Sequence, residues 1–340
     1  MEKTRSEAGR ARQIGSWVLD HAMILLILLA VVYIQIQRPA FLGAASIVNI
    51  ISLTASRLPM ALGIAGAIIL TGTDLSAGRI VGLSAFVSAI FLQRTGIVGK
   101  FLESMGTQNV VLVLVLAMGI GALVGVVNGF CVAKFKLHPF IVTLSTQLMT
   151  YGAYLTLSGA TQISNLDESY TTGLVTKTLF RVGTSSVPTY VLLAVIATAA
   201  MWFIWNKTSF GKNMFAVGSN EDAARVSGVN VTATIMGVFA LAGAMYGYTG
   251  YIEAARLGAS TGTLGLNYET DAISACVIGG VSFVGGIGKI SGVIMGVFMM
   301  QLIISGMTFL GISGNTTYII KGAVILVACA IDMRKYLAKK

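Results

Sequence analysis

The ionisable residues inside long apolar segments are the side chains of this sequence with the clearest chemical meaning. Arg57 lies about ten residues into one uncharged apolar run, and Lys321 lies in another near the carboxyl end. If these runs cross a membrane, a charged group in them must face a hydrated cavity, pair with an opposite charge or reach the surface. We therefore predict that Arg57 faces a cavity or pairs with a carboxylate, and that Lys321 extends to the outer face of the membrane that the chain crosses.

Residues 71–79, Thr-Gly-Thr-Asp-Leu-Ser-Ala-Gly-Arg, join two of the apolar segments. Asp74 is placed to be the N-cap of the helix that follows, since a carboxylate accepts hydrogen bonds from the free N–H groups of a first turn. Alternatively, the segment is a re-entrant turn that lines a transport path, which would bring Asp74, Ser76 and Arg79 to that path. The spacing leaves both interpretations open.

Four more charged residues flank the later apolar segments. Glu253 and Arg256 are three residues apart and can pair on one helix face. Glu269 and Asp271 come just before the next segment. A solvated rim is the simplest interpretation, because most surface ion pairs contribute little. The alternative is an outer mouth that contacts another protein.

Signatures of catalysis are absent from the sequence. The Gly-Lys pairs at 99–100, 211–212 and 288–289 are followed by Phe, Asn and Ile, so none completes a phosphate-binding loop. His21 and His138 form no metal-binding pattern and are predicted to lie at the membrane interface. We expect no catalytic residue, no metal site and no cofactor on this chain.

The composition is that of a membrane protein. Of 340 residues, 55% are hydrophobic and 11% are charged, whereas a soluble domain is about 25% charged. This excludes a soluble globular domain, a disordered chain and a disulfide-rich secreted module. Cys131, Cys276 and Cys329 lie in apolar runs and are predicted to be core residues. We predict a single all-α polytopic membrane domain over residues 1–340.

Ten apolar segments predict transmembrane helices, at about 18–36, 47–70, 76–92, 110–133, 139–157, 188–205, 233–252, 271–285, 290–310 and 316–331. Short or broken helices are expected near 71–92 and 271–290, where glycine-rich polar stretches flank the segments. Most of the 23 Lys and Arg residues fall on the side that holds both termini, which predicts a cytoplasmic location for both ends. This bias and contact with anionic lipid explain the net charge of +10, so no nucleic-acid partner is implied.

The segments outside the membrane are a cytoplasmic tail at 1–17 and two long loops. The outer loop, 158–187, is interpreted as a lid or a docking surface. In the inner loop, 206–232, we predict a short helix that Asn220 caps and that Ser227 and Gly228 end. This helix is either part of a solvated connector or a docking element for a partner.

Glycine forms two stripes with a spacing of four residues, at Gly121, Gly125 and Gly129 and at Gly288, Gly292 and Gly296. Such stripes allow helices to approach closely in lipid. Tight packing within one bundle is the first interpretation, and a dimer seam is the second. The similarity of residues 78–82 to residues 288–292 also hints at duplicated halves.

Four segments together resemble a known family. They are Thr-Asp-Leu-Ser-Ala-Gly-Arg at 73–79, the stretch 210–231 that contains Val-Gly-Ser-Asn-Glu-Asp-Ala-Ala-Arg-Val-Ser-Gly, Ile-Glu-Ala-Ala-Arg-Leu at 252–257, and the glycine-rich stretch 268–288. In this order they resemble the permease subunits of bacterial ribose/galactose-type ABC sugar importers, from about residue 17 to the carboxyl end. Thr73, Ala77 and Arg79, with Arg57 and residues 139–141, look like the galactoside branch. Pro59 and the sequence of the outer loop depart from that pattern.

The resemblance implies a multi-pass protein of the bacterial inner membrane that translocates a monosaccharide, with galactose or a methyl-galactoside expected first. It implies a second copy of the chain, an ATPase subunit that binds ATP and Mg, and a periplasmic or lipid-anchored sugar-binding protein. The family's ATPase-coupling segment matches Gly218, Asn220, Ala223, Ala224, Ser227 and Gly228.

The remaining positions follow from this expectation. Arg57, Asp74, Ser76 and Arg79 would lie on or beside the translocation path, with Asp74 and Arg79 in its inner part. Glu253, Arg256, Glu269 and Asp271 would lie near the outer mouth, on the side of the binding protein. The alternatives are a permease for another sugar such as ribose or xylose, or an ion-coupled secondary transporter. The second would need a buried carboxylate or cation site in mid-span, and the predicted span interiors contain no Asp or Glu.

Overall fold

The structure is a computed structural model that describes residues 22–337, so the predicted tail 1–17 and His21 lie outside the described residues. Its helices are α2 (Ala22–Gln37), α3 (Ala44–Ile69), α4 (Ala77–Phe91), α5 (Val110–Phe135), α6 (Pro139–Ser158), α7 (Thr189–Lys207), α8 (Ser209–Ser219), α9 (Glu221–Val226), α10 (Val231–Leu257), α11 (Tyr268–Ile278), α12 (Ile290–Phe309) and α13 (Gly314–Leu337). A π-helical turn, η1 (Thr171–Val175), and the antiparallel strands β1 (Thr178–Val182) and β2 (Ser185–Pro188) complete the fold.

Each of the ten predicted apolar segments overlaps one helix, although α11 ends at Ile278, seven residues before the predicted segment 271–285 does. Among the described residues, five helices are long and apolar enough to cross a membrane, namely α3, α5, α7, α10 and α12, and α4 is a shorter apolar helix. The chain is therefore a helical, multi-pass membrane protein, while the count of ten spans stays a prediction. α4 and α11 have only 15 and 11 residues, so both predicted short helices are present.

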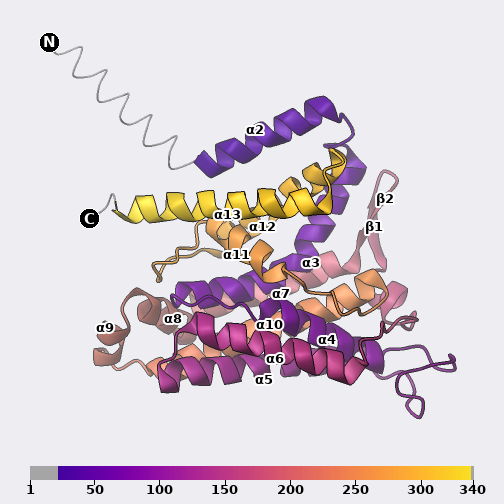
Figure 1. Cartoon of the computed structure of the whole chain (residues 1–340), viewed down its shortest axis with the longest axis horizontal. Coiled ribbons are helices and arrows are strands. Elements are labelled where there is room, and N and C mark those ends of the chain that lie inside the picture. The colour runs from indigo at the N-terminus through magenta and orange to yellow at the C-terminus, as the bar shows by residue number, and fades with distance from the viewer. Residues whose placement is uncertain (1–21, 338–340) are drawn as a thin grey trace.

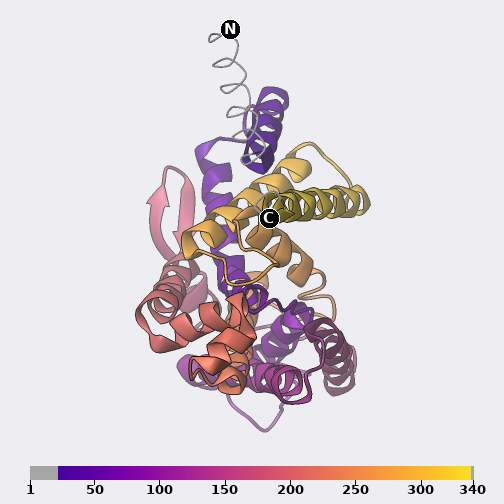
Figure 2. The same ribbon diagram turned by 90° about the vertical axis from the view of Figure 1, so that its left-hand side faces the viewer.

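The helices form two groups that α3 joins. Figures 1 and 2 show α2, α12 and α13 on one side of the molecule and α4, α5 and α6 on the other. α3 packs against both groups, since it contacts α10 and α7 as well as α11 and α12. The beginning of α2, the end of α13 and the α8–α9 segment lie at one end of the molecule, and the β1–β2 hairpin lies towards the opposite end (Figure 1).

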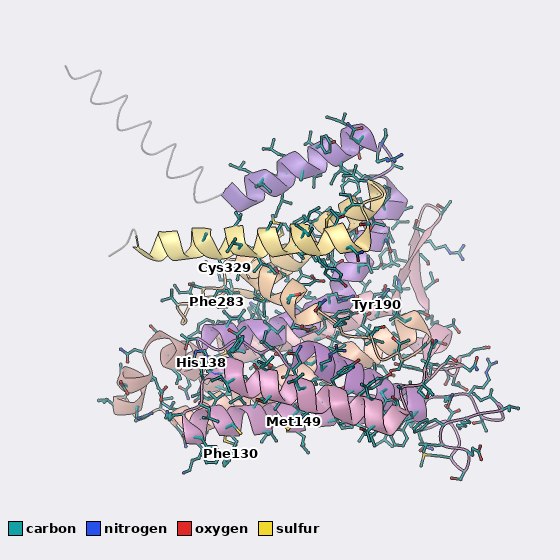
Figure 3. The ribbon with its side chains drawn as sticks, in the orientation of Figure 1. Phe130, His138, Met149, Tyr190, Phe283 and Cys329 are labelled. Carbon is teal, nitrogen blue, oxygen red and sulfur yellow. The ribbon has the colours of Figure 1, made fainter. Side chains whose placement is uncertain are left out.

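The outer faces of α5 and α6 are apolar. Phe130 on α5 and Met149 on α6 are exposed and project away from the helix bundle (Figure 3). Such a surface would be unstable in water but suits lipid. His138 caps α6, because its Nδ1 accepts a hydrogen bond from Phe140 N at 3.3 Å. The predicted core location is confirmed for Cys276, which is buried, while Cys131 and Cys329 are partly buried.

The two glycine stripes pack within the chain. A methyl group on Gly121 or Gly125 would overlap a backbone carbonyl oxygen of α10, and Gly292 and Gly296 meet the α11 backbone in the same way. Helix backbones can approach this closely only where a side chain is absent. Tight packing within one bundle, the first interpretation, is confirmed.

The outer loop is anchored to the helices and contains structure that the sequence pattern did not predict. It forms η1 and the β1–β2 hairpin. Ile163 pairs with Ser260 as an isolated β-bridge, and the buried Tyr170 donates a hydrogen bond from its hydroxyl to the carbonyl oxygen of Tyr251. The loop is therefore packed against the turn after α10.

The inner loop contains the predicted short helix, α9, and a second helix, α8, that was not predicted. Asn220 caps α9, since its side-chain oxygen accepts a hydrogen bond from Ala223 N at 2.9 Å. The helix ends at Ser227, and Gly228 has a φ of +85°, which glycine adopts without strain. Glu221 pairs with Lys136 at 2.5 Å, which ties α9 to the end of α5. Local capping residues therefore define α9 as predicted.

Candidate transport path and coupling segment

A buried carboxylate, Glu253, organises a cluster of charged side chains between α3, α10 and α11. Glu253 is fully buried. Arg256 donates to both of its oxygens, at 3.1 and 2.8 Å, and Arg57 Nε lies 3.6 Å away. The hydroxyl of Tyr268 donates to the same carboxylate at 3.3 Å, and the Arg57 guanidinium stacks 3.3 Å above the Tyr268 ring. Two arginines thus share one carboxylate away from water.

The predicted pairing of Arg57 with a carboxylate and of Glu253 with Arg256 is confirmed. The location of the cluster differs from the solvated rim that was the simplest interpretation. The solvated rim is wrong for Glu253, because α10 continues to Leu257 and carries this residue into the interior. Glu253 therefore lies inside a helix, where the sequence pattern placed no acidic residue. A buried carboxylate needs such partners, since the cost of removing it from water is several kcal/mol.

A second ion pair joins α11 to α13. Lys321 Nζ lies 2.8 Å from the carboxylate of Asp271, and both side chains are largely shielded from solvent. The ammonium group of Lys321 therefore has a counter-charge within the protein. Its extension to the membrane surface stays a prediction.

A small cavity separates the two ion pairs. Its polar walls are Arg57 of α3, Tyr268 and Asp271 of α11, and Gln301 of α12. Methionine, alanine and valine side chains of the same three helices form the rest of its lining. The free space is about 10 Å³, which is room for about one water molecule. Pairing with a carboxylate and facing a cavity were predicted as alternatives for Arg57, and the structure shows both.

Asp74 and Ser76 lie in a buried hydrogen-bonded node at the beginning of α4. Asp74 Oδ1 accepts hydrogen bonds from the backbone and hydroxyl of Ser76, at 3.0 and 2.6 Å, and Oδ2 accepts one from Tyr246 at 3.0 Å. Asn128 of α5 donates to the Ser76 hydroxyl at 3.0 Å. The N-cap is Ser76 rather than Asp74, which corrects the predicted capping role, since Asp74 bonds to the cap residue itself.

Arg79 and Glu269 lie on neighbouring elements. Glu269 is buried against Gly78, where a methyl group would overlap Glu269 Oε2. Arg79 lies 4.0 Å above the Tyr151 ring and donates to the Gly262 carbonyl at 3.3 Å. The expected separation of Arg79 in the inner part from Glu269 at the outer mouth is therefore wrong. The chain returns into the bundle after α10, which brings the first turn of α11 against the first turn of α4.

The residues of the expected coupling segment divide into a buried and an exposed set. Gly218 and Ala224 are buried within the chain. The exposed set comprises Asn220, Ala223, Ser227 and Gly228. Val226 in the same short helix is 90% exposed, although it is a large apolar residue. Sequence reasoning missed Val226, because its exposure depends on how α9 packs against the rest of the chain.

Long apolar helices with buried ion pairs between them are the features of a multi-pass membrane protein. The family described as "Branched-chain amino acid transport system / permease component" matches residues 46–329, and the chain belongs to this family. It is thus a transporter subunit and not an enzyme.

Similar proteins agree over nearly the whole chain. The galactose/methyl galactoside import permease protein MglC of Escherichia coli is 44% identical over 324 residues, which is 94% of each chain. The protein of that name from Salmonella typhimurium is 42% identical over 331 residues, covering 96% of this chain and 97% of that one. The ribose import permease protein RbsC of Escherichia coli is 31% identical over 333 residues, covering 98% of this chain and 99% of that one. No solved structure matches the chain.

Proposed function

We propose that this chain is the membrane permease subunit of an ATP-binding cassette importer for galactose or methyl galactoside in a bacterial inner membrane. The observation that carries this proposal is the 42–44% identity to galactose/methyl galactoside import permeases over almost the full length. The similarity to the ribose import permease is lower, at 31%, so a pentose is the second candidate.

The proposed assembly needs other subunits, because the chain has no phosphate-binding loop of its own. It comprises two copies of this chain, ATPase subunits that bind ATP and Mg, and an external sugar-binding protein. The α8–α9 segment would contact the ATPase. The beginning of α2 and the end of α13 lie at the same end of the molecule, so both would be cytoplasmic, in agreement with the distribution of Lys and Arg. The β1–β2 hairpin would then face the binding protein.

The sugar is proposed to pass beside the cavity between α3, α11 and α12. Arg57, Asp271 and Gln301 offer donors and acceptors there for hydroxyl groups, next to apolar side chains. The cavity has room for one water molecule and is too small for a sugar, so the structure would represent a closed state of this route. Alternating access requires that such a closed state exists. Of the four expected path residues, Arg57 lines this cavity. Asp74 and Ser76 would instead position α4, and Arg79 would lie beside the path.

Uptake of labelled sugars by cells that lack other hexose importers tests the substrate. With the partner ATPase and binding protein also present, we expect the cells to accumulate galactose and methyl galactoside and not to take up ribose. Preferential uptake of ribose would contradict the galactoside assignment.

Replacing Gln301 by Leu tests the proposed route. The substitution keeps the size of a side chain that is 6% exposed but removes the amide that could hydrogen-bond to sugar hydroxyl groups, each such bond being worth about 1 kcal/mol. We expect about a fivefold lower rate of sugar uptake with normal amounts of protein in the membrane. Gln147→Leu on α6, a residue that does not line this cavity, is the control. Equal uptake by both variants would place the route elsewhere.

A further inference from the structure

Three backbone segments are in close contact at the end of the molecule that carries α8 and α9. They are the end of α3 at Ile69, the end of α8 at Gly218 and Ser219, and the turn between α11 and α12 at Gly285 and Gly286. Gly286 N donates a hydrogen bond to the Ile69 carbonyl oxygen at 2.9 Å. We call this contact the glycine joint.

The joint is too tight for any side chain at its glycines. A methyl group on Gly218 would overlap the Ile69 carbonyl oxygen, and one on Gly285 would overlap the Gly218 carbonyl oxygen. A methyl group on Gly286 would lie 2.8 Å from Cα of Ser219. Close-packed backbone has low compressibility, so a displacement of one segment displaces the others.

The joint connects the proposed coupling segment to the walls of the cavity. Asn220, the cap of α9, follows Ser219 directly in the chain. The other two segments of the joint lead to the cavity. One is the end of α3, and the other is the turn that connects α11 to α12. These three helices are the ones that carry Arg57, Asp271 and Gln301 to the cavity.

The turn also has room to move. A hollow of about 490 Å³ lies beside it, lined by Phe215 of α8, Ile287, Lys289 and several glycines of the turn. In Figure 1 this turn is the extended loop beside α8, at the same end as α9. Gly286 thus lies both at the tight contact and beside free space, so the turn is held at one point and has room to move next to it.

We propose that the glycine joint transmits movement of α8 and α9 to the cavity, with Gly218, Gly285 and Gly286 as positioning residues. This inference rests on the proposed function. It assigns the transmission step to backbone contacts and gives the turn between α11 and α12 a role in sugar transport. Coupling is measured by following transport and ATP hydrolysis separately.

The experiment compares Gly286→Ala with Gly280→Ala in the complete importer. Both glycines lie in the same turn and have a positive φ, +67° and +82°, so both substitutions cost similar backbone strain. Gly280 has no atom within 4 Å of the added methyl group, whereas Gly286 meets Ser219. The comparison therefore isolates the contact with α8.

We expect Gly286→Ala to lower the number of sugars transported per ATP hydrolysed about tenfold and Gly280→Ala to leave that ratio unchanged. Ser219→Gly removes one of the crowding atoms, so the double variant Ser219→Gly/Gly286→Ala should recover part of the ratio. The double variant also provides the comparison if Gly286→Ala alone fails to accumulate. If Gly286→Ala and Gly280→Ala transport the same number of sugars per ATP hydrolysed, the glycine joint does not transmit the movement. A wild-type importer that hydrolyses ATP without moving any sugar would contradict the proposed function instead.

Discussion

Replacing Val226 by Glu is expected to separate ATP hydrolysis from sugar uptake. Val226 is 90% exposed on α9, and an apolar side chain in this position is suited to fill a pocket of a partner protein. A carboxylate there would be buried without a counter-charge upon docking, which weakens binding by more than 1.4 kcal/mol, or about tenfold. We expect at least a tenfold loss of ATP-driven uptake and reduced co-purification of the ATPase.

A matched control for this substitution is Val98→Glu. Val98 is fully exposed in the loop between α4 and α5, away from α8 and α9, and receives the same change. We expect it to retain ATPase binding and uptake. If both variants take up sugar at the wild-type rate, α9 does not dock on the ATPase through Val226.

The largest loss of stability is expected for Glu253→Gln. The change leaves the guanidinium groups of Arg57 and Arg256 without their shared carboxylate in the interior. Removing one partner from a buried ion pair costs about 3–5 kcal/mol. A lower midpoint of thermal unfolding in detergent, together with a smaller amount of folded protein in the membrane, is the expected result.

Glu168→Gln provides the comparison for a charge at the surface. Glu168 pairs with Arg94, and its side chain is 74% exposed. Exposed pairs contribute at most about 1 kcal/mol, so this variant should unfold near the wild-type temperature. Indistinguishable unfolding of the Glu253 and Glu168 variants would mean that the Arg57–Glu253–Arg256 cluster does not stabilise the fold.

The helices were predictable from the sequence because their signals are local. Runs of apolar residues place α3 and α5, and Asn220 with Gly228 marks both ends of α9. α8 was missed because only Thr208 separates it from α7, so no polar stretch marks its beginning. The β1–β2 hairpin was missed because all five residues of β1 are exposed, and it lacks the alternation that identifies a half-buried strand.

The candidate site was less predictable because its contacts join distant parts of the chain. The charge of Lys321 was visible, but its pairing with Asp271 depends on α11 packing against α13. Similarly, the charges near 253–256 were visible, but the predicted apolar segment ended at residue 252 whereas α10 continues to Leu257. This five-residue difference decided whether the charges were considered exposed or buried. Tyr246 and Asn128 have no feature in the sequence that links them to Asp74. Periodicity identifies helices but does not say which of them are neighbours.

The central claim is that this chain moves a galactoside only together with an ATPase. The direct measurement is galactose uptake into liposomes that contain this chain with its partner ATPase and binding protein, with and without ATP. We predict uptake that requires ATP and both partners and that methyl galactoside inhibits. Accumulation of galactose by the chain alone under an ion gradient would contradict this account.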